Sequence, residues 1–410
     1  MRTFDYVIVG GGLAAVSAVD GIRQFDPDGS IAMFTDESDP PYHRPPLSKE
    51  FFQAEGAPRD LLHVKPARWF DAQDGLSLFT DRPVTRLDAR AMTVCTADDR
   101  RVKGGRILIA TGGRPRRLEV PGSHLAGVAT LRTAADSEYL REAARCATRV
   151  VLVGAGFIGM ELASTLSKID VDAVVVEVAP RVWDRVFPEA VSSFLRRYFE
   201  ERGVRFMLGS AVTALEGEGR VSRVLLDSGE EVAADLAIMG VGMTPNDELG
   251  AEAGLAVHDG IVVDGFGETT AAHIYAAGDV ARFPDPVAGG LARVEHWDHA
   301  RAHGRHAGRN MAGAGEPFDH LSYFFTHVFD LSINVFGETA DVDRTIVSGE
   351  LGSGRSIVYC VTGNRLTGTI LINATGAMDD CKALVRARPT VEDLLREFEK
   401  PGARPGELVG

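Results

Sequence analysis

The 410-residue sequence lacks several features that mark whole classes of protein. It contains no uninterrupted apolar run of the roughly 18 residues that a membrane-spanning helix needs. Its N-terminus enters an apolar strand pattern at once, without the segments of a secretory signal peptide. These absences predict a cytoplasmic protein that has no membrane partner.

Cysteine and positive charge are also scarce. The four cysteines, at 95, 146, 360 and 381, form neither a C-x-x-C pair nor a zinc pattern, which argues against dithiol redox chemistry and a disulfide framework. The formal net charge of −14 lacks the basic surplus of a nucleic-acid-binding protein. With 45% hydrophobic and 25% charged residues, the chain has an ordinary globular composition and is long enough for two or three domains.

One design occurs twice in this chain. Residues 6–23 and 150–168 each consist of apolar strand residues, a glycine-rich turn and a helical pattern, and a second apolar strand follows each. Such βαβ units, with further strands that end in glycine, predict an α/β fold with doubly wound sheets. After Pro317 the pattern changes to alternating strands and an amphipathic helix over 390–400, which predicts a small C-terminal α+β domain.

Each βαβ turn carries a dinucleotide fingerprint of three small residues. The first permits a tight turn, the second lets backbone approach a pyrophosphate, and the third allows close packing of helix and strand. One such motif is weak, because glycines also serve simply to turn the chain. Two in complete βαβ units predict two dinucleotides, FAD and a nicotinamide nucleotide. The expected contacts are Gly10, Gly12, Leu13, Ala14 and Ala15 in the first unit and Gly154, Gly156, Phe157, Ile158 and Gly159 in the second.

Carboxylates stand where the ribose of each nucleotide is expected. Glu177 ends the second strand of the second unit, where a carboxylate binds the ribose hydroxyls of NAD and repels the phosphate of NADP. No arginine follows it directly, although Arg181 and Arg185 stand further on, and we include Arg185 among the expected contacts. The alternative is an ordinary solvated Glu177. In the first unit we favour Glu37 over Asp36 for the matching place.

Six segments together resemble the FAD-dependent ferredoxin and rubredoxin reductases that supply oxygenases, a group related to monodehydroascorbate reductase and apoptosis-inducing factor. The resemblance covers roughly residues 4 to 316. The segments are PPYHRPPLSKE, ATGGRPRRL, VVLVGAGFIGMELAS, MGVGMTPN, IYAAGDVAR and RVEHWDHA.

The resemblance implies a glutathione-reductase-like architecture with two dinucleotide-binding domains. An FAD-binding domain over 1–110 and 236–316 would enclose an NAD-binding domain over 111–235, and a C-terminal domain would cover 317–410. The disulfide branch of that fold keeps reactive cysteine near the proline-rich loop. This chain has no cysteine before Cys95, so electrons should leave the flavin without a sulfur intermediate.

The resemblance also assigns roles to the proline-rich loop. Arg44 and Pro45 would line the FAD, and Lys49 would approach flavin N5 in a catalytic pair with Glu161. A cation there favours the negatively charged reduced flavin, and a paired carboxylate limits its desolvation cost. The alternative is a solvated loop lysine. Further expected cofactor contacts are Val84, Ala110, Thr111, Gly112, Arg132, Val241, Gly242, Gly278, Asp279, Glu295, His296 and Trp297. Taken by itself, Asp279 could equally be a simple helix N-cap.

The sequence departs from the family pattern near the expected exit of the electrons. Phe325, Thr326 and His327 stand where the family often carries Trp-Ser-Asp, and His43 stands where an acidic residue is usual. These changes leave the electron acceptor open.

Two helical patterns after residue 297 have more than one interpretation. His299, His303 and His306 share a helical face, but no cysteine or carboxylate cluster completes a metal site, so we expect surface histidines and no metal. The arginines at 301, 305 and 309 form either a docking stripe for an acidic carrier or a solvated face.

These features predict an NADH-dependent flavoprotein reductase of the NADH:ferredoxin oxidoreductase type. Hydride would pass from nicotinamide to FAD, and single electrons would pass on to a small acidic carrier, with a [2Fe–2S] ferredoxin of an oxygenase system favoured. The alternatives are reduction of a small molecule, such as a quinone or the ascorbate radical, and a redox sensor similar to apoptosis-inducing factor. Either a monomer or a homodimer is compatible with the sequence.

Overall fold

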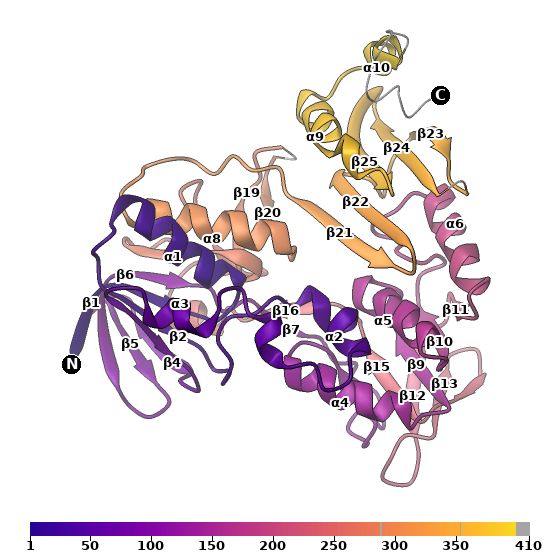
Figure 1. Ribbon diagram of the computed structural model, residues 1–410, viewed down its shortest axis with the longest axis horizontal. Helices are drawn as coiled ribbons and strands as arrows, with labels where there is room; N and C mark the ends of the chain where they lie inside the picture. The colour runs from indigo at the N-terminus through magenta and orange to yellow at the C-terminus, as the bar shows by residue number, and fades with distance from the viewer. Residues whose placement is uncertain (288, 353, 399–410) are drawn as a thin grey trace. The chain divides into compact units, whose positions relative to one another are not determined.

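The computed structural model describes residues 1–287, 289–352 and 354–398, and its backbone divides into two units (Figure 1). Unit 1 comprises Met1–Arg44, Gly56–Arg114 and Met243–Ser322. Unit 2 comprises Pro45–Glu55, Pro115–Gly242 and the described part of the chain from Tyr323 onward.

Unit 1 is built on one sheet of the order β3-β2-β1-β6-β5-β4, with β18 also paired to β6. The pairings of β1 with β2 and β6, of β2 with β3, and of β6 with β18 are parallel, whereas β4, β5 and β6 pair antiparallel. The strands are β1 (Arg2–Val9), β2 (Ile31–Phe34), β3 (Leu76–Phe79), β4 (Val84–Asp88), β5 (Thr93–Thr96), β6 (Arg101–Ile109) and β18 (Ile274–Ala276).

Two helices of unit 1, α1 (Leu13–Phe25) and α8 (Trp297–Met311), lie side by side (Figure 1). Glycines on α8 let the two backbones touch. A Cβ atom on Gly304 would lie 2.1 Å from the carbonyl oxygen of Ala14, and one on Gly308 would lie 2.1 Å from that of Ala18. This close packing fixes the N-terminus of α8 relative to the first glycine-rich turn.

Shorter elements complete unit 1. They are η2 (Arg59–Leu62), α3 (Ala67–Asp71), β16 (Met243–Pro245), α7 (Glu248–Glu252), β17 (Ile261–Val262), η3 (Gly278–Val280), β19 (Ala281–Pro284) and β20 (Leu291–Ala292). The strand β7 (Gly113–Pro115), which pairs with β16, begins in unit 1, and its last residue belongs to unit 2.

The first part of unit 2 is a parallel sheet of the order β11-β10-β9-β15-β8. A three-stranded antiparallel sheet of β12, β13 and β14 accompanies it. The strands are β8 (Val128–Thr130), β9 (Arg149–Val153), β10 (Asp172–Glu177), β11 (Arg205–Leu208), β12 (Val212–Glu216), β13 (Arg223–Leu226), β14 (Glu231–Ala233) and β15 (Leu236–Met239). The helices are η1 (Pro45–Ser48), α2 (Glu50–Gln53), α4 (Ala134–Arg145), α5 (Phe157–Lys168) and α6 (Glu189–Glu200).

The C-terminal part of unit 2 is an antiparallel sheet of the order β21-β22-β25-β24-β23, followed by two helices. The helix expected over 390–400 is present to Phe398, and its last two residues lie outside the described residues. The elements are β21 (Tyr323–Val328), β22 (Leu331–Gly337), β23 (Arg344–Glu350), β24 (Arg355–Thr362), β25 (Arg365–Ile372), η4 (Thr375–Ala377), α9 (Met378–Ala387) and α10 (Val391–Phe398).

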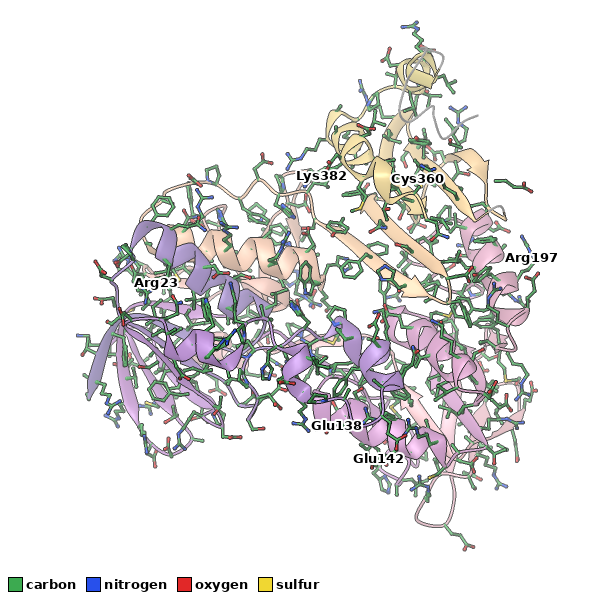
Figure 2. All side chains as sticks on the ribbon, in the orientation of Figure 1. Arg23, Glu138, Glu142, Arg197, Cys360 and Lys382 are labelled. Carbon is green, nitrogen blue, oxygen red and sulfur yellow. The ribbon has the colours of Figure 1, made fainter. Side chains whose placement is uncertain are left out.

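Two cysteines are buried in this C-terminal part. Cys360 lies among the strands of its sheet (Figure 2), and Cys381 lies on α9. Burial raises the pKa of both thiols to about 12. Neither is therefore a thiolate at neutral pH, and neither has the low pKa of a redox-active cysteine.

The structure divides the chain differently from the sequence-based expectation at several places. Residues 111–114 and 317–322 belong to unit 1, and the expected NAD-binding and C-terminal domains share unit 2. The strand Leu236–Met239 was expected to start the second FAD-binding segment, but it pairs with β9 and β8 inside the parallel sheet of unit 2. The border therefore falls after Gly242. The loop 45–55 also packs within unit 2, where the Ser137 hydroxyl donates a hydrogen bond of 2.7 Å to the Leu47 carbonyl.

Within the described part of the chain, no helix combines the length and the apolar character that crossing a bilayer requires.

Candidate functional site

The two glycine-rich turns repeat one backbone geometry. The first glycine of each has a positive φ, +131° at Gly10 and +106° at Gly154. A Cβ atom at Gly10 would lie 2.1 Å from the carbonyl oxygen of Ala110, and one at Gly154 would lie 2.5 Å from that of Gly240. Only glycine fits such a turn, because it lacks the side chain that would meet the neighbouring strand end.

The middle glycines instead face open space. A Cβ atom on Gly12 would meet no atom within 4 Å, and one on Gly156 would meet only the Gly240 oxygen at 3.9 Å. Each is the N-cap of its helix, α1 or α5, and neither cap makes a side-chain hydrogen bond. An uncapped helix N-terminus with open space in front is a binding site for phosphate. Both turns therefore fit the pyrophosphate of a dinucleotide.

The third small residue packs within each unit. Ala15 is fully buried in the core of unit 1, and a Cβ atom on Gly159 would lie 2.0 Å from the Gly154 oxygen. The other expected turn residues, Leu13, Ala14, Phe157 and Ile158, form the first turns of α1 and α5.

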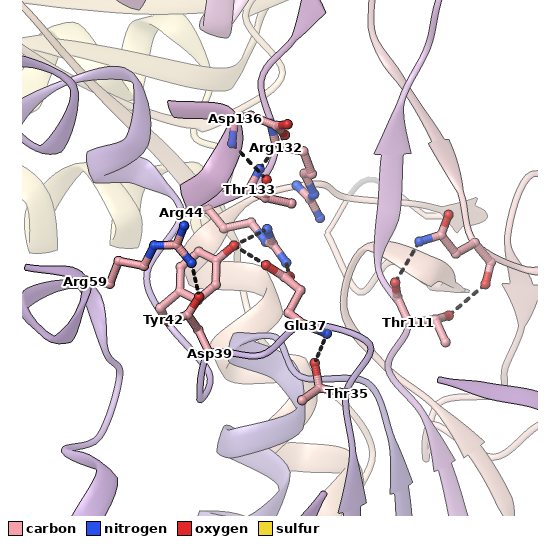
Figure 3. Close-up of polar contacts among 11 residues, drawn as sticks. Thr35, Glu37, Asp39, Tyr42, Arg44, Arg59, Thr111, Arg132, Thr133 and Asp136 are labelled. Atoms are coloured by element: carbon pink, nitrogen blue, oxygen red, sulfur yellow. Dashed lines mark hydrogen bonds and ion pairs between the residues drawn. The ribbon is translucent and has the colours of Figure 1, made fainter. Parts of the chain in front are cut away.

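In unit 1 the expected ribose carboxylate is held by two side chains (Figure 3). The Tyr42 hydroxyl donates to Glu37 Oε2 at 2.5 Å, and Arg44 donates to Glu37 Oε1 at 2.7 Å and to the Tyr42 hydroxyl oxygen at 3.1 Å. Burial opposes the charge of Arg44, but Tyr42 and Glu37 outweigh it and raise the pKa of the guanidinium. Asp36, the alternative residue, is exposed. Sequence reasoning missed Tyr42, although it stands in the proline-rich loop.

In unit 2 the expected ribose carboxylate is held by backbone groups. Glu177 Oε2 accepts a hydrogen bond of 2.6 Å from the N–H of Ala155, which lies inside the glycine-rich turn. Its Oε1 accepts one of 2.8 Å from the N–H of Ala179. Arg185, an expected contact, is exposed and makes no hydrogen bond or ion pair among the described residues.

Several other expected FAD contacts lie close together in unit 1. A Cβ atom on Gly278 would lie 2.8 Å from the Cβ of Ala14. Next to this turn, Arg293 donates to the Asp279 carbonyl oxygen at 3.3 Å and to Glu295 Oε1 at 2.5 Å. The guanidinium of Arg293 therefore joins two expected site residues, and sequence reasoning missed it.

The N-terminus of α8 carries the remaining residues of this group. His296 is its N-cap, and burial lowers the pKa of this imidazole to about 4. Trp297 Nε1 donates a hydrogen bond of 3.0 Å to His43 Nδ1. His43 must therefore be neutral to accept it, and burial lowers the pKa of His43 as well.

A second turn in unit 1 is fixed by Asn246. Its side-chain amide donates to the Thr111 carbonyl at 3.0 Å, and the Thr111 hydroxyl donates to the Asn246 carbonyl at 2.7 Å. The N–H of Asn246 also donates to the Gly112 carbonyl at 2.9 Å. The asparagine thus holds the segment that follows Ala110.

The other expected contacts are spread over the two units. Val84 begins β4 at the edge of the unit 1 sheet and packs against its core. In unit 2, the Arg132 N–H donates to Asp136, which also caps α4 (Figure 3). Val241 and Gly242 follow β15, and a Cβ atom on Gly242 would meet no atom within 4 Å.

Unit 2 contains a buried cluster around Glu161. Lys49 Nζ lies 2.7 Å from Glu161 Oε1 and donates to the Pro45 carbonyl at 3.0 Å. The Thr326 hydroxyl donates to the same carboxylate oxygen at 2.7 Å, and the Ser48 hydroxyl donates to Oε2 at 2.5 Å. Lys49 and Glu161 are only 7% and 5% exposed, so Lys49 is not a solvated loop lysine. Sequence reasoning gave neither Ser48 nor Thr326 a role here.

The expectation of surface histidines on α8 was wrong. His299 and His303 are 0% and 1% exposed, and their rings pack against Phe283 and Phe318. Burial lowers the pKa of His303 to about 3. Among the described residues, no group of three or more His, Cys, Asp or Glu side chains could hold a metal ion.

The basic stripe on α8 is partly neutralised. Arg301 lies 3.3 Å from Asp298, and Arg309 lies 2.6 Å from Glu316. Arg305 between them is exposed. These contacts favour a solvated face over a concentrated positive patch.

The chain matches the family described as pyridine nucleotide-disulphide oxidoreductase over residues 4–304. It belongs to this family. It is similar to rhodocoxin reductase from Rhodococcus erythropolis, with 34% identity over 368 residues that cover 90% of this chain and 86% of that protein. It is 32% identical to rubredoxin–NAD(+) reductase from Ectopseudomonas oleovorans, with coverage of 90% and 95%.

The fold is also that of a solved reductase. The structure of the covalent putidaredoxin reductase–putidaredoxin complex matches with a TM-score of 0.91 and 30% identity over 100% of this chain and 99% of that chain. The prediction of an oxidoreductase with the two-dinucleotide fold is thus confirmed.

Proposed function

We propose that the protein is an NADH-dependent reductase that binds FAD in unit 1 and NADH in unit 2 and delivers electrons to a small redox protein. The observation that carries the proposal is the repeated pair of open, uncapped helix N-termini, at Gly12 and Gly156, each in a unit with a fixed carboxylate. A chain with two such cradles can hold two dinucleotides.

The first cradle and its surroundings suit FAD. The N-terminus of α1 would bind the pyrophosphate, and Glu37, oriented by Tyr42 and Arg44, would accept hydrogen bonds from the adenosine ribose. Asp279 would meet the ribityl chain, and the N-terminus of α8 would stabilise negative charge on the isoalloxazine. When bound, FAD supplies hydride acceptance and one-electron donation, which no protein side chain provides.

The second cradle suits NADH better than NADPH. Glu177 is fixed by the N–H groups of Ala155 and Ala179, so it cannot easily turn away from a bound ribose. A 2′-phosphate at this position would stand against a carboxylate, and such a like-charge contact costs several kcal/mol.

The pair of Lys49 and Glu161 is our proposed catalytic pair. A buried ammonium persists only with a partner, and Glu161 is itself stabilised by the hydroxyls of Ser48 and Thr326. The loop thereby holds a positive charge in a fixed position and excludes water from it. We propose that this charge favours the negatively charged reduced cofactor.

We propose a small iron–sulfur carrier as the acceptor, with a [2Fe–2S] ferredoxin favoured. The support is the naming of similar proteins as rhodocoxin reductase and rubredoxin–NAD(+) reductase, and the solved complex of putidaredoxin reductase with putidaredoxin. The cysteines buried in unit 2 have raised pKa values, so we assign them no step.

The test is NADH oxidation by the purified protein with and without a bacterial [2Fe–2S] ferredoxin, with cytochrome c as the final reporter. We expect cytochrome c reduction that requires both NADH and ferredoxin and that saturates with ferredoxin. If turnover is equally fast without ferredoxin, or faster with a quinone, the acceptor is a small molecule and the proposed protein carrier is wrong. Slow reoxidation under all conditions, with a change in size upon NADH addition, would instead indicate a redox sensor.

A further inference from the structure

Beside Glu177, unit 2 has a surface hollow of about 360 Å³. Its wall includes two arginines, Arg181 and Arg196, together with Glu189 and Leu208. Leu208 is the direct partner of Glu177 in the parallel pairing of β11 with β10. The hollow therefore begins one strand away from the carboxylate that we assign to the NADH ribose, and two arginines line it.

Both arginines in this wall already have carboxylate partners. Arg181 Nε lies 2.7 Å from Asp184 Oδ1, and its Nη1 lies 3.8 Å from Glu189 Oε2. Arg196 Nε lies 2.8 Å from Glu200 Oε1. A guanidinium is the group that binds phosphate through two parallel hydrogen bonds, but here a carboxylate occupies the Nε edge of each.

We propose that this hollow is a latent 2′-phosphate site, which Asp184 closes to NADP(H) in addition to the repulsion by Glu177. The inference rests on the proposed function, because it assumes that Glu177 meets the adenosine ribose. A phosphate on the ribose 2′-oxygen needs a cation within reach, and Arg181 is the nearest in sequence to Glu177. Asp184 both engages that arginine and adds a second negative charge beside it.

The two acidic residues should act together. Glu177→Gln removes the repulsion but leaves Arg181 engaged by Asp184. Asp184→Asn releases the Nε edge of Arg181, whose Nη1 keeps only the longer 3.8 Å contact with Glu189. It leaves the carboxylate of Glu177 against the phosphate. Groups that share an interaction are energetically coupled. The double variant should therefore gain more affinity for a 2′-phosphate than the product of the gains in the two single variants.

The probes are adenosine 2′,5′-bisphosphate and adenosine 5′-monophosphate, which differ only in the 2′-phosphate. Calorimetry of the purified full-length protein gives a dissociation constant for each, and their ratio measures the preference for the phosphate. We expect the preference for the bisphosphate to rise about 30-fold in Glu177→Gln and at most about threefold in Asp184→Asn. In the double variant it should rise by about tenfold more than the product of these two factors. The gain should shrink in high salt, because exposed charge pairs are screened.

Two control variants test whether the effect depends on the position of the carboxylate and on Arg181. Asp172→Asn removes a carboxylate that lies 2.7 Å from both Arg149 and Arg205 at the other end of β10, about 16 Å from Glu177 along the strand. Added to Glu177→Gln, it should not change the preference further. Arg181→Ala, added to the double variant, should abolish the gain.

The outcomes separate this inference from the proposed function. If the unmodified protein binds the monophosphate, but Asp184→Asn added to Glu177→Gln changes the ratio no more than Asp172→Asn does in the same background, the latent site is wrong and the NADH assignment stands. If the gain survives Arg181→Ala, the phosphate lies elsewhere and the inference is again wrong. Failure to bind either nucleotide would overturn both.

Discussion

The two glycine-rich βαβ units have nearly the same backbone and different side chains around it. Gly10 and Gly154 lie close to the backbone at the end of a neighbouring strand, and Gly12 and Gly156 face open space in front of a helix. Yet Glu37 in the first unit is held by Tyr42 and Arg44, whereas Glu177 in the second is held by backbone N–H groups. The backbone of both units fits a dinucleotide, and in the proposed function the side chains distinguish FAD from NADH.

The helices that follow the two turns differ in the same way. Seven residues after the first glycine, α1 carries the buried Ser17 and α5 carries the buried Glu161. The carboxylate attaches the proline-rich loop and β21 to α5 through Lys49, Ser48 and Thr326. Unit 2 therefore has a polar core at this place where unit 1 has a small side chain.

The largest expected change in stability comes from removing the buried carboxylate that distinguishes unit 2 from unit 1. Glu161→Ala leaves Lys49 buried without its partner, which should lower the free energy of unfolding by about 3–5 kcal/mol. Ser17→Ala, at the matched position of unit 1, should cost about 1 kcal/mol or less. Urea unfolding of both variants measures the contrast, and equal losses would contradict the assigned role of the ion pair.

The third small residue of each turn gives a second contrast. Gly159→Ala places a Cβ atom 2.0 Å from the Gly154 oxygen and should cost about 1–3 kcal/mol, with at least a tenfold loss of NADH affinity and unchanged flavin content. Ala15→Gly should cost only about 0.5–1 kcal/mol. Nucleotide titration and flavin absorbance check both, and tolerance of Gly159→Ala would show that the two turns are interchangeable.

Buried histidines should make α8 in unit 1 sensitive to acid. Burial lowers the folded-state pKa of His303 to about 3, so below pH 6.5 the unfolded chain binds a proton that the folded chain does not. Stability should therefore fall by up to about 1.4 kcal/mol per pH unit for this histidine between about pH 6.5 and 3. Hydrogen exchange at pH 7 and pH 5 should show α8 opening before α5. The reverse order would mean that the histidines do not control acid stability.

The smallest effect is expected at Tyr42. Tyr42→Phe removes the hydrogen bond to Glu37 and the one that Arg44 donates to the Tyr42 hydroxyl, but it leaves the ion pair of Glu37 with Arg44, so it should cost about 1 kcal/mol. FAD should dissociate about fivefold more readily, and the preference for NADH should not change. Fluorescence of released flavin gives the affinity. A shift in nucleotide preference would contradict the separate assignment of the two units.

The sequence alone could predict the parts of this site that local geometry determines. The fingerprint glycines follow from the positive φ at Gly10 and Gly154 and from the close carbonyl oxygens, and Glu177 follows from its place at a strand end. The pair of Lys49 and Glu161 came from the family resemblance. It could not come from spacing, because the two residues meet only after the loop packs on α5.

The features that the sequence could not predict depend on tertiary packing. Helical periodicity put His299 and His303 on one face of α8, but it could not show that Phe283 and Phe318 cover that face while Gly304 and Gly308 pack on α1. The position of β15 between β9 and β8 likewise depends on strand order, which no local pattern contains.

The central claim is that the two units hold different dinucleotides and that electrons pass from NADH to FAD. Gly12→Val and Gly156→Val test it most directly, because a Cβ atom added at either position would enter open space in front of α1 or α5, with no atom closer than 3.9 Å. The measurement is anaerobic titration with NADH, followed by flavin absorbance. We predict one FAD per chain in the unmodified protein, bleached by about one equivalent of NADH, and no flavin in Gly12→Val. Gly156→Val should keep its FAD and stay yellow when NADH is added. Loss of FAD from Gly156→Val, or its unimpaired bleaching, would contradict the account.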